Sequence, residues 1–266
     1  MTLITLLSDF GLRDPYVAQM KSVIRSTTSE AEIIDISHGI EKHSIAAGSF
    51  LLETTTPFFP MGSIHVGVVD PDVGGPRLPI VIACEKSVLI GPDNGLLHRA
   101  ARKLGFQAAY KITNPKFNRN KVSSTFHGRD IFAFTAGKIA EGAKPEEVGP
   151  ELEAIVDLNI PDPEYSKNTI TCRVLYVDSF GNVITNISEA SLDKLGFRQG
   201  IRFSIITRRR TSYHKGSSTT SYFDIPEDHF GLMLGSQGYL EIALREASAA
   251  AKLHLKPLDS LSIRFS

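Results

Sequence analysis

The sequence of 266 residues has two cysteines, no tryptophan and no excess of charge of either sign. Cys84 and Cys172 lie far apart in apolar runs, which excludes a dense disulfide framework and predicts reduced core thiols in a cytoplasmic protein. Since 29 basic residues balance 29 acidic ones, we expect no general attraction to nucleic acid or to anionic lipid. We therefore expect a small-molecule or protein partner.

The sequence also lacks long apolar runs. None approaches the roughly 18 residues that a membrane span requires. The first residues, Met-Thr-Leu-Ile-Thr-Leu-Leu-Ser-Asp, have neither the basic start nor the long apolar core of a signal peptide. These absences predict a soluble protein that is neither exported nor embedded in a membrane.

The first half of the chain alternates apolar runs with helical patterns. We predict strands at 3–7, 31–36 and 64–69, with helices at 16–27 and 45–53 between them. This alternation is typical of a mainly parallel sheet with crossover helices. Further along we expect strands at 80–83, 87–90 and 108–112, helices at 95–104 and 126–142, and a surface loop at 114–125.

The composition changes between about residues 155 and 168, where turn formers and charges replace the apolar period. We place a linker at 158–168, between an α/β domain at 1–157 and a small all-β barrel domain at 169–266. Strands are expected at 170–177, 183–187, 202–207, 222–225, 238–244 and 261–265. The segment that begins with three arginines and continues to residue 220 is expected to be a solvated loop, because no aromatic residues interleave with its charges.

Two carboxylates follow predicted strands in the first domain. Asp9 ends the first apolar run and Asp70 ends the run at 64–69, so both belong to the sheet edge where open α/β folds bind ligands. The turn after Asp70 is rich in Gly and Pro and brings Arg77 back toward that carboxylate. A simpler interpretation is that Asp70 caps its own turn and Arg77 is a surface partner.

His127 lies at the N-terminus of the helix predicted at 126–142. The positive end of a helix dipole disfavours a charged imidazole there, and the free backbone N–H groups attract anions. His127 is thus a candidate proton acceptor. The alternative is a structural histidine at the start of the helix.

Six motifs in one order resemble the S-adenosyl-L-methionine hydroxide adenosyltransferases, the water-using relatives of fluorinase and chlorinase. They are Ser8-Asp9-Phe10-Gly11, Val69-Asp70-Pro71 with Arg77, Gly91-Pro92-Asp93-Asn94-Gly95, Phe126-His127-Gly128-Arg129-Asp130, Phe180-Gly181-Asn182 with Thr185-Asn186, and Ser236 with Gly238-Tyr239-Leu240. The resemblance covers nearly the whole chain. It implies an N-terminal α/β domain, a C-terminal β-barrel, a homotrimer with sites between subunits, and cleavage of S-adenosylmethionine by water to adenosine and methionine.

The resemblance also implies roles for individual residues. Asp70, Arg77 and His127 match the catalytic trio. Four positions match substrate contacts: Asp9 at the ribose hydroxyls, Asp178 and Ser236 near the amino acid group of methionine, and Asn182 at adenine. Three residues depart from the pattern of the relatives: Thr56 stands in place of a tyrosine under the sugar, His43 in place of an aromatic ring, and Asp72 in place of glycine.

The implied reaction suits these residues. A sulfonium is already a good leaving group, so attack at the ribose C5′ needs no metal, no cofactor and no acid. It needs an oriented water. Arg77 can hold Asp70 in a bidentate ion pair, while a neutral His127 can accept a proton.

Two alternatives remain from other classes. A metal-dependent hydrolase of a nucleotide-like substrate would use Asp70 and Asp72 with some of His38, His65 and His127. The spacing argues against it, because no metal-ligand signature is present and Arg77 would repel a cation. A non-catalytic protein that binds a nucleoside or S-adenosylmethionine would keep the same site, and only product analysis distinguishes it from an enzyme.

Overall fold

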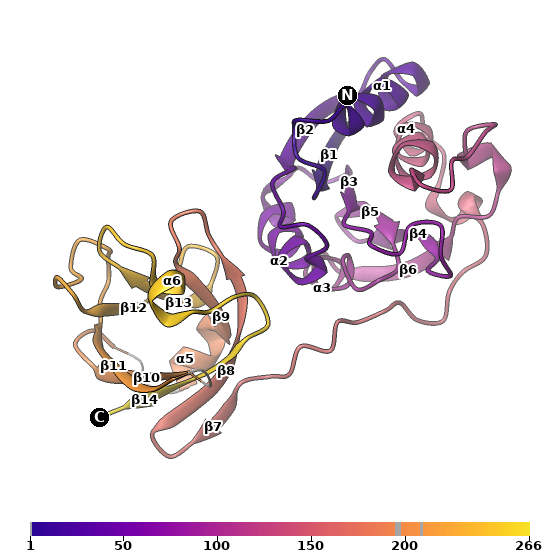
Figure 1. Ribbon diagram of the computed structural model, residues 1–266. Coiled ribbons are helices and arrows are strands. Elements are labelled where there is room, and N and C mark those ends of the chain that lie inside the picture. Colours follow the sequence, from indigo (N-terminus) through magenta and orange to yellow (C-terminus); the bar gives the residue numbers. More distant parts are fainter. Residues whose placement is uncertain (1, 195–197, 208–209) are drawn as a thin grey trace. The chain divides into compact units, whose positions relative to one another are not determined.

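The computed structural model describes residues 2–194, 198–207 and 210–266. The chain divides into two compact units, Met1–Leu158 and Asn159–Ser266, each of which is described by itself (Figure 1). The segment expected to be a linker, 158–168, includes the short strand β7 (Glu164–Ser166), which pairs with β8 (Thr169–Val177) in the second unit.

The first unit contains one six-stranded sheet with the order β2-β1-β3-β5-β4-β6. β2, β1, β3 and β5 are parallel, and β4 runs antiparallel to β5 and β6. The expected α/β unit with a mainly parallel sheet is confirmed. Its strands are β1 (Leu3–Ser8), β2 (Glu32–Ser37), β3 (Ser63–Val68), β4 (Pro79–Cys84), β5 (Ser87–Pro92) and β6 (Phe106–Lys111).

Helices cover both faces of this sheet (Figure 1). One layer packs α1 (Tyr16–Thr27) against the π-helical turn η3 (Gly128–Ala133) and α4 (Phe134–Ala140), and the other pairs α2 (Ile45–Thr55) with α3 (His98–Lys103). The helix expected at 95–104 is therefore shorter, and the one expected at 126–142 begins as a π-helix. Three 3₁₀ turns complete the unit: η1 (Thr56–Phe58), η2 (Pro115–Phe117) and η4 (Pro145–Val148).

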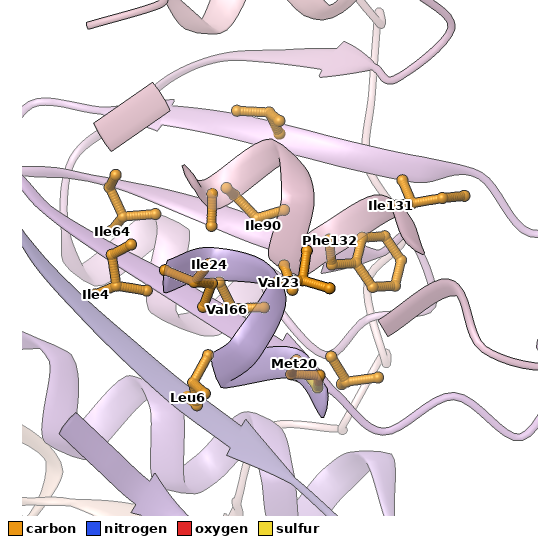
Figure 2. Packing of buried hydrophobic residues seen from close by; sticks show 14 of the residues in the cluster. Ile4, Leu6, Met20, Val23, Ile24, Ile64, Val66, Ile90, Ile131 and Phe132 are labelled. Atoms are coloured by element: carbon orange, nitrogen blue, oxygen red, sulfur yellow. The ribbon is translucent and has the colours of Figure 1, made fainter. Parts of the chain in front are cut away.

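The side chains of the inner parallel strands β1, β3 and β5 are almost all buried on both faces, whereas those of the edge strand β2 are partly exposed. Leu6 and Val66 join Met20 and Phe132 in the core beneath α1 and η3 (Figure 2). On the opposite face Gly48 of α2 approaches the sheet closely. Burial on both sides explains why the strands read as continuous apolar runs.

The second unit is a closed barrel of seven strands. The order β14-β10-β11-β12-β13-β9-β8 closes through a β14–β8 pairing, and β7 pairs with β8 beside the ring. The expected all-β barrel is confirmed. Its elements are β8 (Thr169–Val177), β9 (Val183–Ser188), α5 (Glu189–Lys194), β10 (Arg202–Thr207), β11 (Arg210–Ser218), β12 (Phe230–Leu234), β13 (Tyr239–Leu244), α6 (Ala249–Leu253) and β14 (Ser260–Phe265).

Two predictions in the barrel were wrong. Most of the segment expected to be a solvated loop is β11, which pairs with β10 and β12, although Arg208 and Arg209 lie outside the described residues. The strand expected at 222–225 is a turn, in which Asp224 accepts hydrogen bonds from two hydroxyl side chains. In both cases backbone pairing or local capping, rather than side-chain apolarity, decides the structure.

Across the described part of the chain, we find no helix with the length and apolar composition of a membrane span.

Candidate active site

Asp9 and Asp70 lie at the same edge of the first sheet, just after the ends of their strands. Ser8 of β1 lies opposite Val68 of β3 in parallel register, so both carboxylates follow the carboxyl ends of neighbouring strands. Asp9 is buried, and its Oδ2 accepts a hydrogen bond from the backbone N–H of His43 at 2.9 Å. The loop after β2 thus orients the Asp9 carboxylate.

Asp70 and Arg77 form a buried, bidentate ion pair. Arg77 donates from Nε to Asp70 Oδ1 at 2.9 Å and from Nη2 to Oδ2. The two side chains are only 4% and 6% exposed, respectively. The turn between them is closed by main-chain bonds to Asp70 and Asp72, and Gly74 adopts a φ of 81° there. The part of the simpler interpretation that places Arg77 at the surface is therefore wrong.

His127 joins this pair through one ring nitrogen. Arg77 Nη2 lies 2.8 Å from His127 Nδ1. Because a guanidinium can only donate, Nδ1 must accept, and the neutral ring carries its proton on Nε2. Burial lowers the pKa of His127, as does the charge of Arg77, while Asp70 and Asp130 partly oppose them. The trio thus holds a neutral His127 whose Nε2–H is a donor.

Two further residues support the trio and were not predicted as site residues. Asn94 donates from Nδ2 to the carbonyl of Val69 at 2.9 Å, directly before Asp70. The ring of Phe132 packs under Arg77, with the guanidinium carbon 5.4 Å from the ring centroid. The Gly-Pro-Asp-Asn-Gly motif contains Asn94, but the sequence indicated only a turn or a helix cap.

In the second unit, Asp178 and Asn182 come together. Asp178 Oδ1 accepts from the backbone N–H groups of Phe180 and Asn182, and its Oδ2 accepts from Asn182 Nδ2 at 2.9 Å. Both residues line a cleft of about 710 Å³ together with the exposed rings of Phe180 and Phe223. Ser236 is exposed on the turn 235–238, outside this lining. The structure therefore groups two of the three expected contacts here.

A buried carboxylate beside this cleft was also missed. Glu241 accepts a hydrogen bond from the hydroxyl of Tyr222, which lines the cleft, at 2.6 Å. Burial raises the pKa of Glu241, and the negative charge of Asp178 adds to the effect, while the Tyr222 bond partly opposes it. Burial raises the pKa of Tyr222, and so does the carboxylate of Glu241. Alternation along β13 places Glu241 on the face opposite the core residues Leu240 and Ile242, so the sequence does not reveal that this position is buried.

Three of the residues considered for a metal site have other hydrogen-bond partners. His65 Nδ1 bonds with Thr5 at 2.8 Å, His38 Nδ1 bonds with Ser8 at 2.7 Å, and Arg77 occupies both oxygens of Asp70. Within the described ranges, His, Cys, Asp and Glu form no group of three suited to a metal ion.

The three residues that differ from the pattern of the relatives can also be located in the structure. The hydroxyl of Thr56 donates to the Leu52 carbonyl at 2.7 Å and thereby caps α2. His43 has a φ of 67°, a left-handed conformation that is strained for a side chain of this kind, and its backbone N–H holds Asp9. Asp72 is exposed on the turn before Arg77.

These features define a class: an α/β unit with a hydrogen-bonded Asp–Arg–His trio at its sheet edge, joined to a β-barrel with an aromatic cleft. Models of the SAM hydroxide adenosyltransferase N-terminal and C-terminal domains match residues 4–149 and 172–262. The chain belongs to this family.

Individual relatives match this chain over nearly its whole length. The (R)-S-adenosyl-L-methionine hydrolase of Methanocaldococcus jannaschii is 35% identical, over 99% of this chain and 96% of the relative. A fluorinase of Nocardia brasiliensis is 26% identical, over 98% and 96%. The crystal structure of an uncharacterized conserved protein from Thermotoga maritima superposes with a TM-score of 0.91 at 31% identity, covering 98% of this chain and 99% of that one.

Proposed function

We propose that this chain is an enzyme that hydrolyses S-adenosyl-L-methionine to adenosine and L-methionine. The observation that carries the proposal is the hydrogen-bonded Asp70–Arg77–His127 trio in a chain 33–35% identical to several (R)-S-adenosyl-L-methionine hydrolases. Water attacks the ribose C5′ as the bond from C5′ to sulfur breaks. The electron pair of that bond stays on sulfur, which becomes the neutral thioether of methionine.

The geometry assigns different tasks to the three side chains. While Arg77 donates to Nδ1, His127 has no free acceptor, so the expectation that His127 takes the proton conflicts with this contact. We give that role to Asp70, whose oxygens keep further lone pairs. His127 Nε2–H donates to the water oxygen and orients it, and Arg77 holds both partners in place.

The substrate contacts complete the proposal. Asp9 binds the ribose hydroxyls, Asn182 binds adenine, and Asp178 and Ser236 bind the amino acid group of methionine. The sulfonium leaves without help, so the mechanism uses no cofactor and no metal. The exposed rings beside Asn182 offer faces on which a purine can stack.

We also propose a homotrimer with sites between subunits. The proposed contacts divide between the two units, with Asp9 and the trio in the first and Asp178, Asn182 and Ser236 in the second. Light scattering of the active protein should give the mass of three chains. An active monomer would contradict the intersubunit site. We place the enzyme in the cytoplasm, since Cys84 and Cys172 are buried free thiols.

Hydrolysis in ¹⁸O-labelled water tests the reaction. We expect one label in the 5′-hydroxyl of adenosine and none in methionine, in the presence of EDTA and without halogenated nucleoside when fluoride or chloride is added. Recovery of intact S-adenosylmethionine would support a binding protein instead. Activity lost with EDTA and restored by Zn²⁺ would support a metallohydrolase, and methylthioadenosine as main product would show that water is not the nucleophile.

A further inference from the structure

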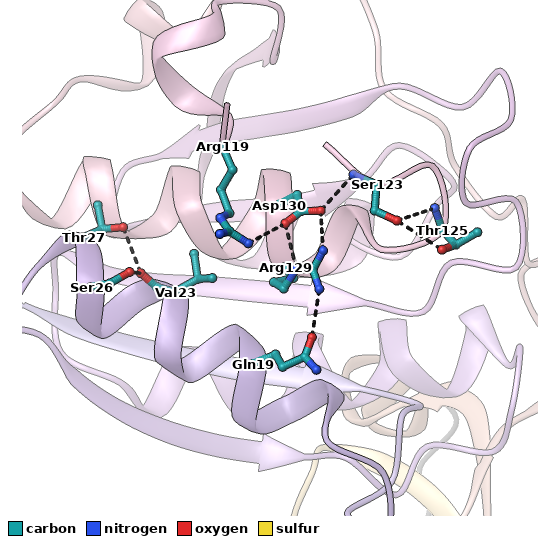
Figure 3. Close-up of polar contacts among 9 residues, drawn as sticks. All are labelled: Gln19, Val23, Ser26, Thr27, Arg119, Ser123, Thr125, Arg129 and Asp130. Atoms are coloured by element: carbon teal, nitrogen blue, oxygen red, sulfur yellow. Dashed lines mark hydrogen bonds and ion pairs between the residues drawn. The ribbon is translucent and has the colours of Figure 1, made fainter. Parts of the chain in front are cut away.

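A second buried carboxylate lies next to the trio. Asp130 is in η3, three residues after His127, and its side chain is 0% exposed. It accepts from Arg129 Nε and Nη2 at 2.7 and 2.8 Å, from Arg119 Nη1 at 3.1 Å and from the backbone N–H of Ser123 at 2.9 Å. Figure 3 shows Asp130 at the centre of these donors. A buried carboxylate with this many donors is held in one position.

These bonds tie η3 to two other segments. Arg119 and Ser123 belong to the stretch before η3, and the Arg119 backbone N–H also donates to the Asp130 carbonyl at 3.0 Å. Arg129 Nη1 reaches Gln19 Oε1 of α1 at 2.9 Å (Figure 3). We call these five residues the Asp130 clamp.

The Asp130 clamp matters because the position of the His127 ring depends on the position of the first residue of η3. The His127 ring reaches Arg77, which is 50 positions earlier in the chain, and His127 directly precedes the first residue of η3. A single π-helical turn is a less regular support than an α-helix, and such turns occur frequently at functional sites. A shift of η3 by a fraction of an ångström would lengthen the bond between Arg77 and His127.

We propose that Asp130 is a positioning residue for His127: the clamp fixes the start of η3 so that Nδ1 meets Arg77 and Nε2–H faces the water. This inference rests on the proposed function. It adds a residue that touches neither the substrate nor the reacting atoms.

The charge of Asp130 gives the proposal a distinct signature. The charged groups that act on the His127 ring are Arg77, which lowers its pKa, and Asp70 and Asp130, which raise it against the lowering by burial. A protonated ring cannot accept from Arg77, so activity should fall as pH drops through the pKa of His127. Removing the charge of Asp130 lowers that pKa further, and the acid limb of the profile should move to lower pH.

The test compares three variants by kcat, KM and pH profile. Asp130→Asn keeps the shape of the side chain. It should lower kcat at least about tenfold, since small misplacements of a catalytic group cost up to about 10²-fold in rate. We expect little change in KM and an acid limb at lower pH. Arg119→Ala removes one of the donors to Asp130. Because the Arg119 side chain is half exposed, we expect a smaller loss of kcat than in Asp130→Asn. Glu141→Gln removes an exposed ion pair of the same layer and should leave all three measurements unchanged.

A folded Asp130→Asn variant with the wild-type kcat and acid limb would overturn the proposal. If that variant does not fold, Arg119→Ala decides, and an unchanged kcat there would overturn it. The ¹⁵N NMR signals of the His127 ring separate this inference from the proposed function. In the wild type we expect the Nε2–H tautomer with a hydrogen-bonded Nδ1, and in Asp130→Asn a weakened bond at Nδ1, whether or not S-adenosylmethionine is cleaved.

Discussion

Arg77→Ala should lower the rate of S-adenosylmethionine cleavage by at least about 10²-fold, because the trio loses the group that holds both Asp70 and His127. The same change leaves the buried carboxylate of Asp70 without its guanidinium partner. Breaking a buried ion pair by removing one side costs about 3–5 kcal/mol, so the free energy of unfolding should also fall. Steady-state kinetics and denaturant unfolding measure the two effects.

Arg77→Lys is the matched control. Lysine keeps the positive charge but cannot form the planar bidentate contact while also donating to His127. We expect stability between those of the wild type and Arg77→Ala, and a rate close to that of Arg77→Ala. If Arg77→Lys turned over at the wild-type rate, charge alone would suffice, and the geometric role of Arg77 would be wrong.

Phe132→Ala should destabilise the first unit by about 3–5 kcal/mol, the usual cost of emptying the site of a fully buried aromatic ring. Phe132 is 0% exposed and belongs to the core shown in Figure 2. Its ring also packs under the guanidinium of Arg77. Activity per folded molecule should therefore fall as well, which kinetics below the unfolding transition would measure.

Phe50→Ala separates the two effects of Phe132. Phe50 is equally large and buried in the same unit, but it lies on α2, in the layer that covers the other face of the sheet. We expect a comparable loss of stability with wild-type activity per folded molecule. Equal losses of activity in both variants would mean that the ring of Phe132 acts on the trio only through global stability.

The first unit was the more predictable from sequence because its signals are strong and mutually consistent. The helical period of Val17, Met20, Val23 and Ile24 gives α1 with the bounds observed. The barrel was less predictable: the polar residues of β11 lie in a strand because β10 and β12 supply backbone partners on both sides. Such non-local pairing leaves little trace in a short window of sequence.

The candidate site shows the same division. Two carboxylates after neighbouring strands, and an arginine returned by a turn, could be predicted because parallel strands end at one edge. The tautomer of His127 could not, since it depends on which nitrogen meets Arg77. Asp130 and Glu241 also required the structure, because a carboxylate in an apolar run indicates neither its burial nor its donors.

The cleft of the second unit is built from connections between strands of a closed ring. Its lining comes from residues 178–182 between β8 and β9, from residues 222–223 between β11 and β12, and from residues 244–248 at and after the end of β13. The ring closes through pairings between its strands, so most of these residues can vary without breaking it. Substitutions in these connections should therefore reshape the cleft while the barrel stays intact, whereas substitutions around Phe132 are constrained by the packing of the core.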